Sequence, residues 1–459
     1  MMRRHVLVLL CAAVAFSGFA PARADVHAVQ VRNNVYSPQE LRVARGDTVV
    51  WTAFDDGHTV TAEDLSFDYY ATRTMRKGES VQHTFTEDAT VYYSCRVHRP
   101  AMFGVVVVGT GGSGGGGGGE PPEVRNVPTA EFPTIGSAVK DASPGSIVEI
   151  APGRYVEDVL VRAPGLTIRG SGTSPSHVIL EGASQRATAF RVTANLTRIE
   201  NLTVQGFSSN GIIFEEVEGF AVTSVRALDN GAYGVRAVGS RFGVLRNVRA
   251  LRSAVAGISI ASCKTCDVII ENSYASENYI GVQGVDAGSL VIRDSQFVNN
   301  LSGVVLRSGA TGRGPQSGSH VYGNEVHDNA TRTVPGSRSR APDDIAAGIG
   351  IWLAGGMHGV IEDNVVSGNE YGIAVTWFAF PSMQVRVVGN DVDRSRHADL
   401  AWDGIGANVC FAGNAAASGG SVSSDPPAIE SVYACDAPAT VGIPNPRIVA
   451  NILLYTQRV

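Results

Sequence analysis

The sequence has little of what marks membrane-spanning or nucleic-acid-binding proteins. After the first 24 residues no apolar run reaches the roughly 20 residues that a membrane helix needs. Positive charge is scarce, since 37 Lys and Arg face 43 Asp and Glu, for a formal net charge of −6. Residues 1–24 hold three Arg and no acid, so the charge without them is −9. We therefore expect no nucleic-acid partner.

The first 24 residues have the order of features found in a secretory signal peptide. Arg3 and Arg4 precede an apolar stretch, and Ala22-Arg23-Ala24 supplies small residues at a cleavage site. This pattern predicts cleavage after Ala24. The mature protein would then be secreted or periplasmic and would have no transmembrane segment.

Four residues between positions 58 and 102 form a set of metal-binding donors: His58, Cys95, His98 and Met102. Two imidazoles, one thiolate and one thioether are the ligands of a blue copper site, with the Met sulfur as a weak axial donor. The spacing Cys-x2-His-x3-Met suits a loop between two strands. Zinc is the rival metal, but it prefers four strong ligands, and Met is not one of them.

The residues around these donors resemble the cupredoxins, in particular the plastocyanin, amicyanin and pseudoazurin group. The resemblance covers roughly 26–109 and includes SPQELRVARGDTVVWTAFDDGHTVTA and YYSCRVHRPAM. It implies a β-sandwich that holds one type 1 copper ion through His58, Cys95, His98 and Met102. It also implies one-electron transfer to a redox partner protein, with His98 at an apolar surface.

Five cysteines follow the leader, and in an oxidising compartment an odd number leaves one thiol unpaired. The predicted copper ligand Cys95 is the natural odd one. Cys410 with Cys435 and Cys263 with Cys266 are then the candidate disulfides. The alternative for Cys263-Lys-Thr-Cys266 is a redox-active pair, which needs a helix N-terminus to lower a thiol pKa. The surrounding sequence predicts short strands instead.

A glycine-rich stretch divides the chain into two modules. It separates a copper domain, 25–108, from a second domain, 124–459, and the connecting residues 109–123 have the composition of a flexible linker. We expect the copper domain to reorient freely on this tether.

The second domain is built from repeats of 22–24 residues aligned on one glycine. The aligned glycines are Gly211, Gly234, Gly257, Gly281, Gly303, Gly348 and Gly372, and the interval of 45 contains an insertion at about 331–346. This period with short strands predicts a right-handed parallel β-helix with an irregular C-terminal cap, so the whole protein is expected to be all-β. The apolar residues one and three places after each glycine should point inward: Ile212 and Phe214, Ile258 and Ile260, Val304 and Leu306, Ile349 and Ile351, Ile373 and Val375.

Two further features fit such a rod. Asn210, Asn278, Asn300 and Asn369 lie near predicted corners, where they either form hydrogen-bonded ladders or follow turn propensity alone. A short amphipathic helix over about 135–142 would cover the open N-terminal end.

This domain, over about 125–405, resembles the pectate-lyase-like superfamily and, within it, the periplasmic copper-binding NosD-like family. The resemblance implies a binding scaffold, with polysaccharide as the expected ligand. A lyase or epimerase would need outward carboxylates stacked beside a base. The positions two and four after each glycine stack no acids.

The remaining chemistry-bearing residues of the rod cluster late in the chain. His397, Asp399 and Asp403 are weak candidates for catalysis, and Trp352, His358, Trp377 and Trp402 could line a sugar groove. The alternative is an irregular cap with solvated charges and packed Trp. Asp343 and Asp344, in the insertion, could bind a cation or simply be solvated.

The sequence is compatible with three functions. The first is a one-electron carrier on a binding scaffold, which the copper set favours. The second is a polysaccharide lyase or epimerase with an accessory copper domain. The third is copper delivery or storage.

Overall fold

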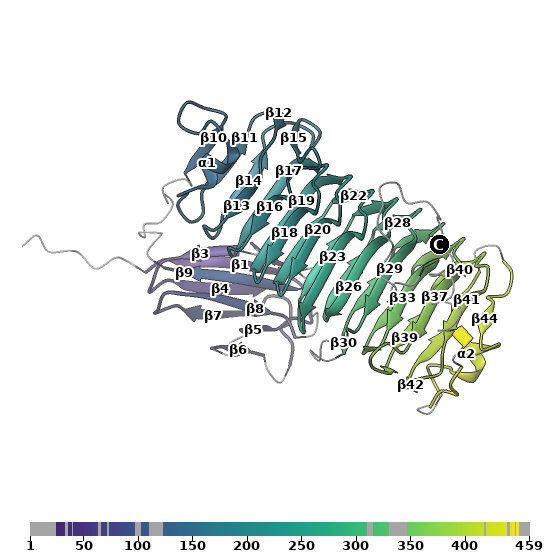
Figure 1. The fold of residues 1–459 in the computed structure, drawn as a ribbon. Helices are drawn as coiled ribbons and strands as arrows, with labels where there is room; N and C mark the ends of the chain where they lie inside the picture. Colours follow the sequence, from purple (N-terminus) through teal and green to yellow (C-terminus); the bar gives the residue numbers. More distant parts are fainter. Residues whose placement is uncertain are drawn as a thin grey trace, which may run out of the picture.

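The computed structural model is nearly all-β and consists of a small sandwich beside a long rod (Figure 1). It describes residues 24–32, 35–38, 40–62, 66–70, 73–96, 102–109, 123–309, 315–329, 347–416, 419–437, 441–445 and 447–448. The all-β prediction is confirmed. None of the helices in these ranges has the length and apolar character needed to cross a membrane.

The N-terminal module is a sandwich of two sheets, as the cupredoxin resemblance implies. The first sheet contains β2 (Val35–Ser37), β1 (Val26–Arg32), β4 (Thr48–Ala53) and β7 (Ser80–Thr84), in that order. The second contains β3 (Glu40–Val43), β9 (Phe103–Val108), β8 (Ala89–Ser94), β5 (Val60–Ala62) and β6 (Asp68–Tyr69). Alternation places one face of each strand in the core; in β4, Val49, Trp51 and Ala53 are buried and the residues between them are partly exposed.

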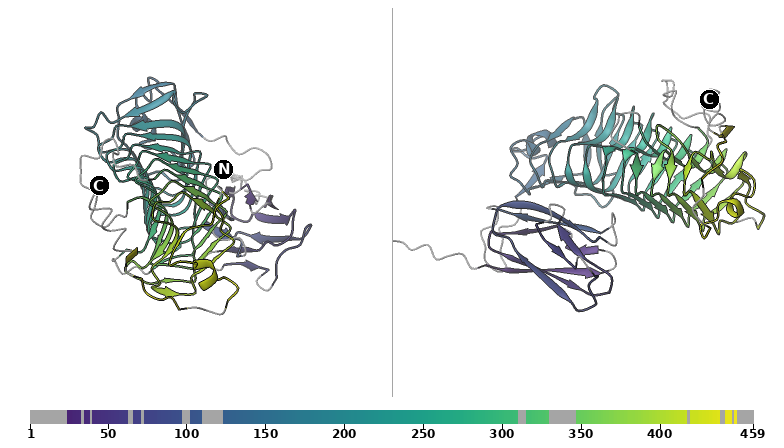
Figure 2. Two further views of the ribbon diagram at one scale, coloured as in Figure 1. Left: turned by 90° about the vertical axis from the view of Figure 1, so that its right-hand side faces the viewer. Right: turned by 90° about the horizontal axis from the view of Figure 1, so that it is seen from below.

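The rod is a parallel β-helix, since its strands pair in parallel with strands one turn away (Figures 1 and 2). Two of its sides form one sheet: β10 (Val124–Val127), β11 (Ile147–Ile150), β12 (Gly153–Tyr155), β14 (Thr167–Gly170), β15 (Val178–Glu181), β17 (Thr197–Gln205), β19 (Glu218–Leu228), β21 (Arg241–Arg246), β22 (Arg249–Leu251), β24 (Val268–Glu271), β25 (Tyr274–Ser276), β27 (Leu290–Arg293), β28 (Gln296–Val298), β31 (His320–Tyr322), β32 (Glu325–His327), β35 (Val360–Glu362), β36 (Val365–Ser367), β39 (Arg386–Val388), β40 (Asp391–Asp393) and β43 (Cys410–Ala412).

The remaining sides are formed by two smaller sheets. The larger contains β13 (Val159–Val161), β16 (Thr188–Val192), β18 (Asn210–Glu215), β20 (Tyr233–Val238), β23 (Ala256–Cys263), β26 (Ile280–Ala287), β29 (Ser302–Arg307), β33 (Ile349–Ala354), β37 (Tyr371–Thr376), β41 (Ala398–Trp402) and β44 (Ser424–Asp425). The smaller contains β30 (Gln316–Ser317), β34 (Gly356–Met357), β38 (Ser382–Met383) and β42 (Gly406–Ala407).

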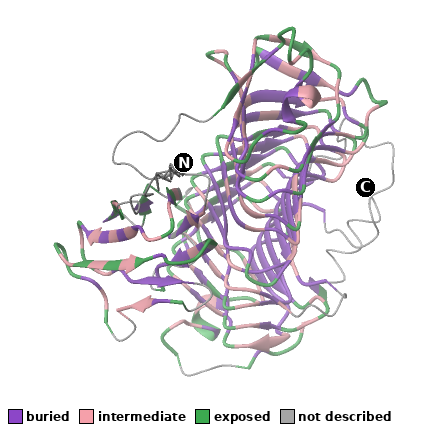
Figure 3. Cartoon of the chain, turned by 90° about the vertical axis from the view of Figure 1, so that its left-hand side faces the viewer, coloured by how far each residue is buried: buried purple, intermediate pink, exposed green. Residues whose placement is uncertain are grey.

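A continuous apolar core fills the rod, as the repeat pattern predicts (Figure 3). Inward positions stack on one another along the axis; Ile258, for example, pairs in register with Val282 of the next turn, and both are fully buried. Since every turn buries its apolar residues against two neighbours, the core depends on stacking.

The structure corrects the glycine alignment at one turn. Val304 pairs with Ile351, so the glycine that continues the column after Gly303 is Gly350 and not Gly348. A Cβ on Gly350 would lie 2.6 Å from the carbonyl oxygen of Gly372, which explains why this position requires glycine. The inward pair of this turn is therefore Ile351 and Leu353. The insertion that obscured the interval lies outside the described residues.

Asparagine ladders run along two corners of the rod. One contains Asn278, Asn300, Asn329 and Asn369, and the other contains Asn324, Asn364, Asn390 and Asn414. In both ladders the backbone N–H of each of the first three residues donates to the side-chain oxygen of the next asparagine, one turn ahead. Asn210, which was a candidate for these ladders, does not join them, because it lies within β18 and donates to Thr188 and Ser209.

Both ends of the rod are closed. The predicted N-terminal helix is α1 (Ile135–Val139), which begins with a capping box between Thr134 and Ser137. At the other end lies α2 (Ile429–Val432). A disulfide joins Cys410 of β43 to Cys435, and a second joins Cys263 to Cys266, so both candidate pairs are formed.

The sandwich packs against the side of the rod, which differs from the expected free tether (Figures 1 and 2). The ring of Tyr92 in β8 stacks on Phe242 of β21, and its hydroxyl donates to the carbonyl oxygen of Glu218 at 2.9 Å. The rod presents Phe242, Ile269 and Val291 here as an outward apolar cluster. The linker composition could not reveal this contact, because it depends on residues on both surfaces.

Candidate metal centre

His58 lies just before β5 and is 1% exposed. Its backbone forms an isolated bridge with Met75, whose N–H donates to the His58 carbonyl oxygen at 2.6 Å. On the ring, Nε2 lies 2.7 Å from Asp55 Oδ1, and Nδ1 is buried inside the sandwich. Because Asp55 engages Nε2, Nδ1 is the nitrogen that would bind a metal. A carboxylate on the other ring nitrogen is the usual support for a metal-binding His.

Cys95 follows β8 directly, is fully buried and takes part in no disulfide. The backbone N–H of Thr59 donates to Cys95 Sγ at 3.3 Å. Since Thr59 is the residue after His58, this bond places the predicted thiolate and imidazole ligands beside each other. Thr59 is fixed in turn, because its carbonyl oxygen accepts from the Tyr36 hydroxyl at 2.5 Å and its Oγ1 accepts from the N–H of Arg96.

Met102 is fully buried and lies immediately before β9. Its carbonyl oxygen accepts from the N–H of Cys95 at 3.0 Å, which closes the base of the loop between β8 and β9. His98 is in this loop and lies outside the described residues, as do Pro100 and Ala101. The structure thus brings together three of the four predicted ligands.

Aromatic side chains pack together in the core of the sandwich near the predicted ligands. Tyr93 is fully buried, with its ring 4.7 Å from that of Tyr36 and 5.2 Å from that of Trp51, and burial raises the pKa of its phenol. A Cβ at Gly104 would overlap the Tyr93 ring, so this glycine lets the ring pack close to the ligand loop.

The donors fit a copper ion better than a hard cation. In the described ranges no three His, Cys, Asp or Glu side chains gather as a possible metal site. Cys95 sulfur and Met102 sulfur, both fully buried, are soft donors that select copper. A Zn²⁺ site would lack a fourth strong ligand.

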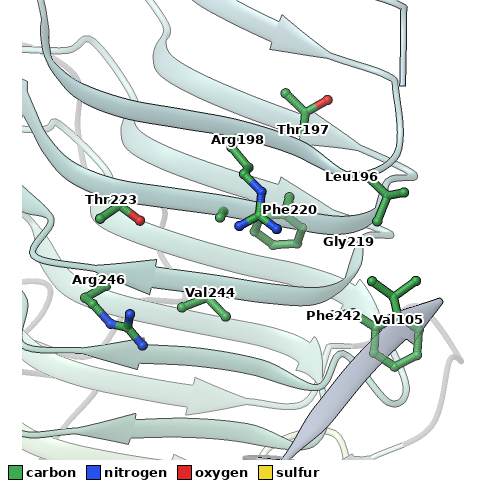
Figure 4. Close-up of a pocket in the computed structure, with 11 residues that line it drawn as sticks. Val105, Leu196, Thr197, Arg198, Gly219, Phe220, Thr223, Phe242, Val244 and Arg246 are labelled. Atoms are coloured by element: carbon green, nitrogen blue, oxygen red, sulfur yellow. The ribbon is translucent and has the colours of Figure 1, made fainter. Parts of the chain in front are cut away.

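A pocket lies where the sandwich meets the rod (Figure 4). Val105 of β9 closes one side and Phe242 lies beside it, while Arg198 and Arg246 extend from the rod over the other side. No acid lines this pocket. Arg246 is paired with Glu271, which also binds Arg293, so the Arg246 guanidinium is held in place.

The structure does not bring the weak catalytic candidates into one site. His397 contacts Glu370 at 3.3 Å. Asp399 is buried and accepts from the N–H and hydroxyl of Ser423. Asp403 is fully buried and accepts from the backbone N–H groups of Trp377 and Ile405. Asp399 thereby ties its strand to the C-terminal segment, and Asp403 ties together two successive turns, so both carboxylates have structural roles.

Most of the tryptophans predicted to line a groove are buried. Trp402 is part of the rod core, and Trp352 is 2% exposed, with its indole N–H donating to Thr376. Trp377 is 42% exposed and His358 is also exposed. Asp343 and Asp344 lie outside the described residues.

Comparisons with known families agree with the division of the chain. Residues 25–109 match the model of copper binding proteins of the plastocyanin/azurin family. Residues 154–340 match the model of periplasmic copper-binding protein (NosD). Each domain is thus similar to a family of copper-binding proteins.

Individual relatives cover only parts of the chain. A cell surface glycoprotein of Methanothermus fervidus is 32% identical over 105 residues, which are 22% of this chain and 17% of that protein. Among solved structures, a reduced amicyanin variant is 34% identical over 18% of this chain and 82% of its own, with a TM-score of 0.17. The A-module of Azotobacter vinelandii mannuronan C-5 epimerase AlgE4 is 13% identical over 59% of this chain and 87% of its own, with a TM-score of 0.43.

Sequence reasoning missed the residues that support the predicted ligands. Asp55 stands three positions before His58, where the pair Asp55-Asp56 offered only a weak signal. Thr59 acts through its backbone N–H, which every residue except proline has, so its residue type does not reveal this role. Tyr92 and Tyr93 are adjacent residues of the same type on opposite faces of β8, so residue type alone does not show which of them meets the rod.

Proposed function

We propose that the sandwich is a type 1 copper protein that exchanges single electrons with a partner protein. The observation that carries this proposal is the amide of Thr59 donating to the buried Cys95 sulfur beside His58. An N–H directed at sulfur stabilises a thiolate and tunes the redox potential of a metal bound to it. A bound copper ion would supply the one-electron couple.

The residues of this chain would keep the site rigid between oxidation states. His58, Cys95 and Met102 would hold the ion together with His98. Asp55 orients His58, and the backbone bond between Cys95 and Met102 fixes the ends of the ligand loop. Burial of these donors excludes water. A site that changes little on oxidation lowers the reorganisation that each electron transfer requires.

The proposed location is the periplasm or the extracellular space. The predicted leader over residues 1–24 supports it, as does the match of the rod to a family described as periplasmic. In this proposal the rod is a binding scaffold, with polysaccharide as the predicted ligand.

A catalytic rod is less well supported. With the register corrected, the outward positions two after the aligned glycines are Ile213, Arg236, Ser259, Gln283, Val305, Trp352 and Ala374. This row contains no acid. In its later turns it is also covered, since Val305, Trp352 and Ala374 share a buried cluster with Ile448 from near the C-terminus.

The test is absorption and paramagnetic resonance of the copper-loaded full chain. We expect an intense blue band that ascorbate bleaches and oxidation restores, and we expect Cys95→Ser to abolish it. Met102→Leu should keep the colour but raise the potential, because the axial thioether stabilises the oxidised ion.

Met75→Leu is the matched control for Met102→Leu. Both methionines are fully buried beside the same site, but only Met102 is predicted to be a ligand. We expect Met75→Leu to leave the potential unchanged. A colourless copper-loaded protein, or equal shifts in the two variants, would refute the assignment; copper uptake without reversible cycling would favour delivery or storage.

A further inference from the structure

The smallest sheet of the rod carries two methionines in one column. In β34 and β38, Met357 pairs directly with Met383 across adjacent turns. Because opposite residues of a parallel ladder share a face, the two thioethers lie on the same side of this sheet. The inward partners in these strands are Gly356 and Ser382, which are buried, whereas both methionines are partly exposed.

Small residues and one histidine neighbour this pair. Ser317 precedes Met357 in the column and Ala407 follows Met383, so small side chains flank the pair on both sides. His358 is exposed, and its backbone N–H donates to the Met383 carbonyl oxygen at 3.0 Å. An imidazole is thereby anchored by its backbone to the second methionine strand.

Methionine is rare in the chain after residue 24. Residues 25–459 contain four methionines, of which Met75 and Met102 are buried at the predicted copper site. The other two are this pair. Neither lies within residues 154–340, the segment that matches the NosD family model.

From this juxtaposition we propose that Met357 and Met383 form a second metal site, which binds Cu(I) with His358 as a third donor. Thioether sulfur is a soft ligand that favours Cu(I) over hard divalent cations. Adjacent strands are about 4.8 Å apart, and two metal–sulfur bonds of about 2.3 Å span nearly the same distance. The backbone spacing therefore matches what one ion bridging the two sulfurs would need.

The site is separate from the predicted blue copper centre. Figure 1 shows β30 and β42, the outer strands of this sheet, along the lower edge of the rod beyond the sandwich. The proposal holds whether or not the sandwich carries out electron transfer.

Methionine-methyl NMR of the full chain tests the proposal directly. Anaerobic titration with Cu(I), and in parallel with redox-inert Ag(I), should move the methyl signals of Met357 and Met383 together. Met357→Leu should abolish the shift of the Met383 methyl, and the reverse should also hold. Leu conserves volume, so the thermal unfolding of the rod should stay unchanged. Met75→Leu is the control and should leave both rod signals responsive.

Stoichiometry gives a second readout. In competition with a chromophoric Cu(I) chelator, the unmodified chain should take up one more equivalent than the Met357→Leu/Met383→Leu variant. His358→Ala should weaken uptake at this site about tenfold, in line with the loss of a supporting ligand. The blue band should be unaffected in all four rod variants, namely the two single methionine variants, the double variant and His358→Ala. Rod methyl signals that stay fixed after the sandwich is saturated, or equal stoichiometry in the double variant, would overturn the proposal.

Discussion

The ring of Tyr92 lies stacked on the ring of Phe242, with centroids 4.6 Å apart and 16° between the planes. Tyr92 is three residues before the predicted ligand Cys95, and Phe242 lies on the rod. The two domains therefore meet directly behind the strand that leads into the candidate metal centre.

Loss of the Tyr92 ring should separate the domains. The stacked pair is worth about 1 kcal/mol beyond its buried area, and the hydrogen bond to Glu218 about 1 kcal/mol more. We expect Tyr92→Ala to increase the radius of gyration in small-angle scattering and to leave the blue band intact. Tyr69→Ala, on the far strand β6, serves as control; an equal radius in both variants would count against a stable interface.

Asp55 should matter for copper affinity although it is not a predicted ligand. Asp55→Ala removes the carboxylate that holds the His58 ring, and such losses typically weaken metal binding by 10–100-fold. Chelator competition would measure the change. Asp56→Ala is the matched control, because Asp56 accepts from the N–H of Lys77 and does not contact His58 in any described bond. Similar affinities for the two variants would show that Asp55 has no supporting role.

Asn364 should be among the costliest residues of the rod to replace. It is fully buried and donates from its amide to the carbonyl oxygens of Val321 and Glu362, while its own oxygen accepts from Asn324. Asn364→Ala leaves several buried groups unpaired, at about 1–3 kcal/mol for each. We expect a clear fall in the free energy of unfolding by denaturant titration, whereas the exposed Asn126→Ala should have little effect.

Asp403 should make stability depend on pH. Burial raises its pKa to about 6 from 3.8, and the amides of Ile405 and Trp377 offset only part of that rise. The folded chain holds this proton more tightly than the unfolded chain. The contribution is therefore complete below about pH 4 and is lost as the pH rises through 6, by about 3 kcal/mol in total.

The measurement is denaturant unfolding of the unmodified chain and Asp403→Asn at pH 4 and pH 7. The unmodified chain should lose more stability than the variant between these values. The difference between pH values is the relevant quantity, because Asn also replaces one of the two acceptor oxygens. Parallel pH profiles would exclude the titration of Asp403 as the cause.

The sequence predicted the features that depend on local pattern. The glycine period and the inward apolar pairs indicated the rod because each turn repeats the same steric demands, and Ile258 and Ile260 are buried as expected. The insertion after residue 330 shifted one turn by two residues, because glycines at 348 and 350 fit the pattern equally well. Only the pairing of Val304 with Ile351 distinguishes them.

Features that depend on distant partners could not be predicted in this way. The asparagine corners were anticipated, but membership of a ladder requires exact stacking, which Asn278 achieves and Asn210 does not. The contact between Tyr92 and Phe242 joins residues 150 positions apart on two domains. At the candidate metal centre, side-chain types identified the donors. The hydrogen bond from the backbone amide of Thr59 could not be predicted from the type of that residue.

The short chain segment between the domains changes how strong their contact needs to be. Thirteen residues, 110–122, join the sandwich to the rod, so each surface meets the other at a local concentration of the order of millimolar. A contact as small as the one around Tyr92 can then be populated without the affinity that two separate proteins would need. Cleavage within this segment would remove that raised local concentration. The sandwich would then dissociate from the rod at ordinary protein concentrations, although neither surface had changed.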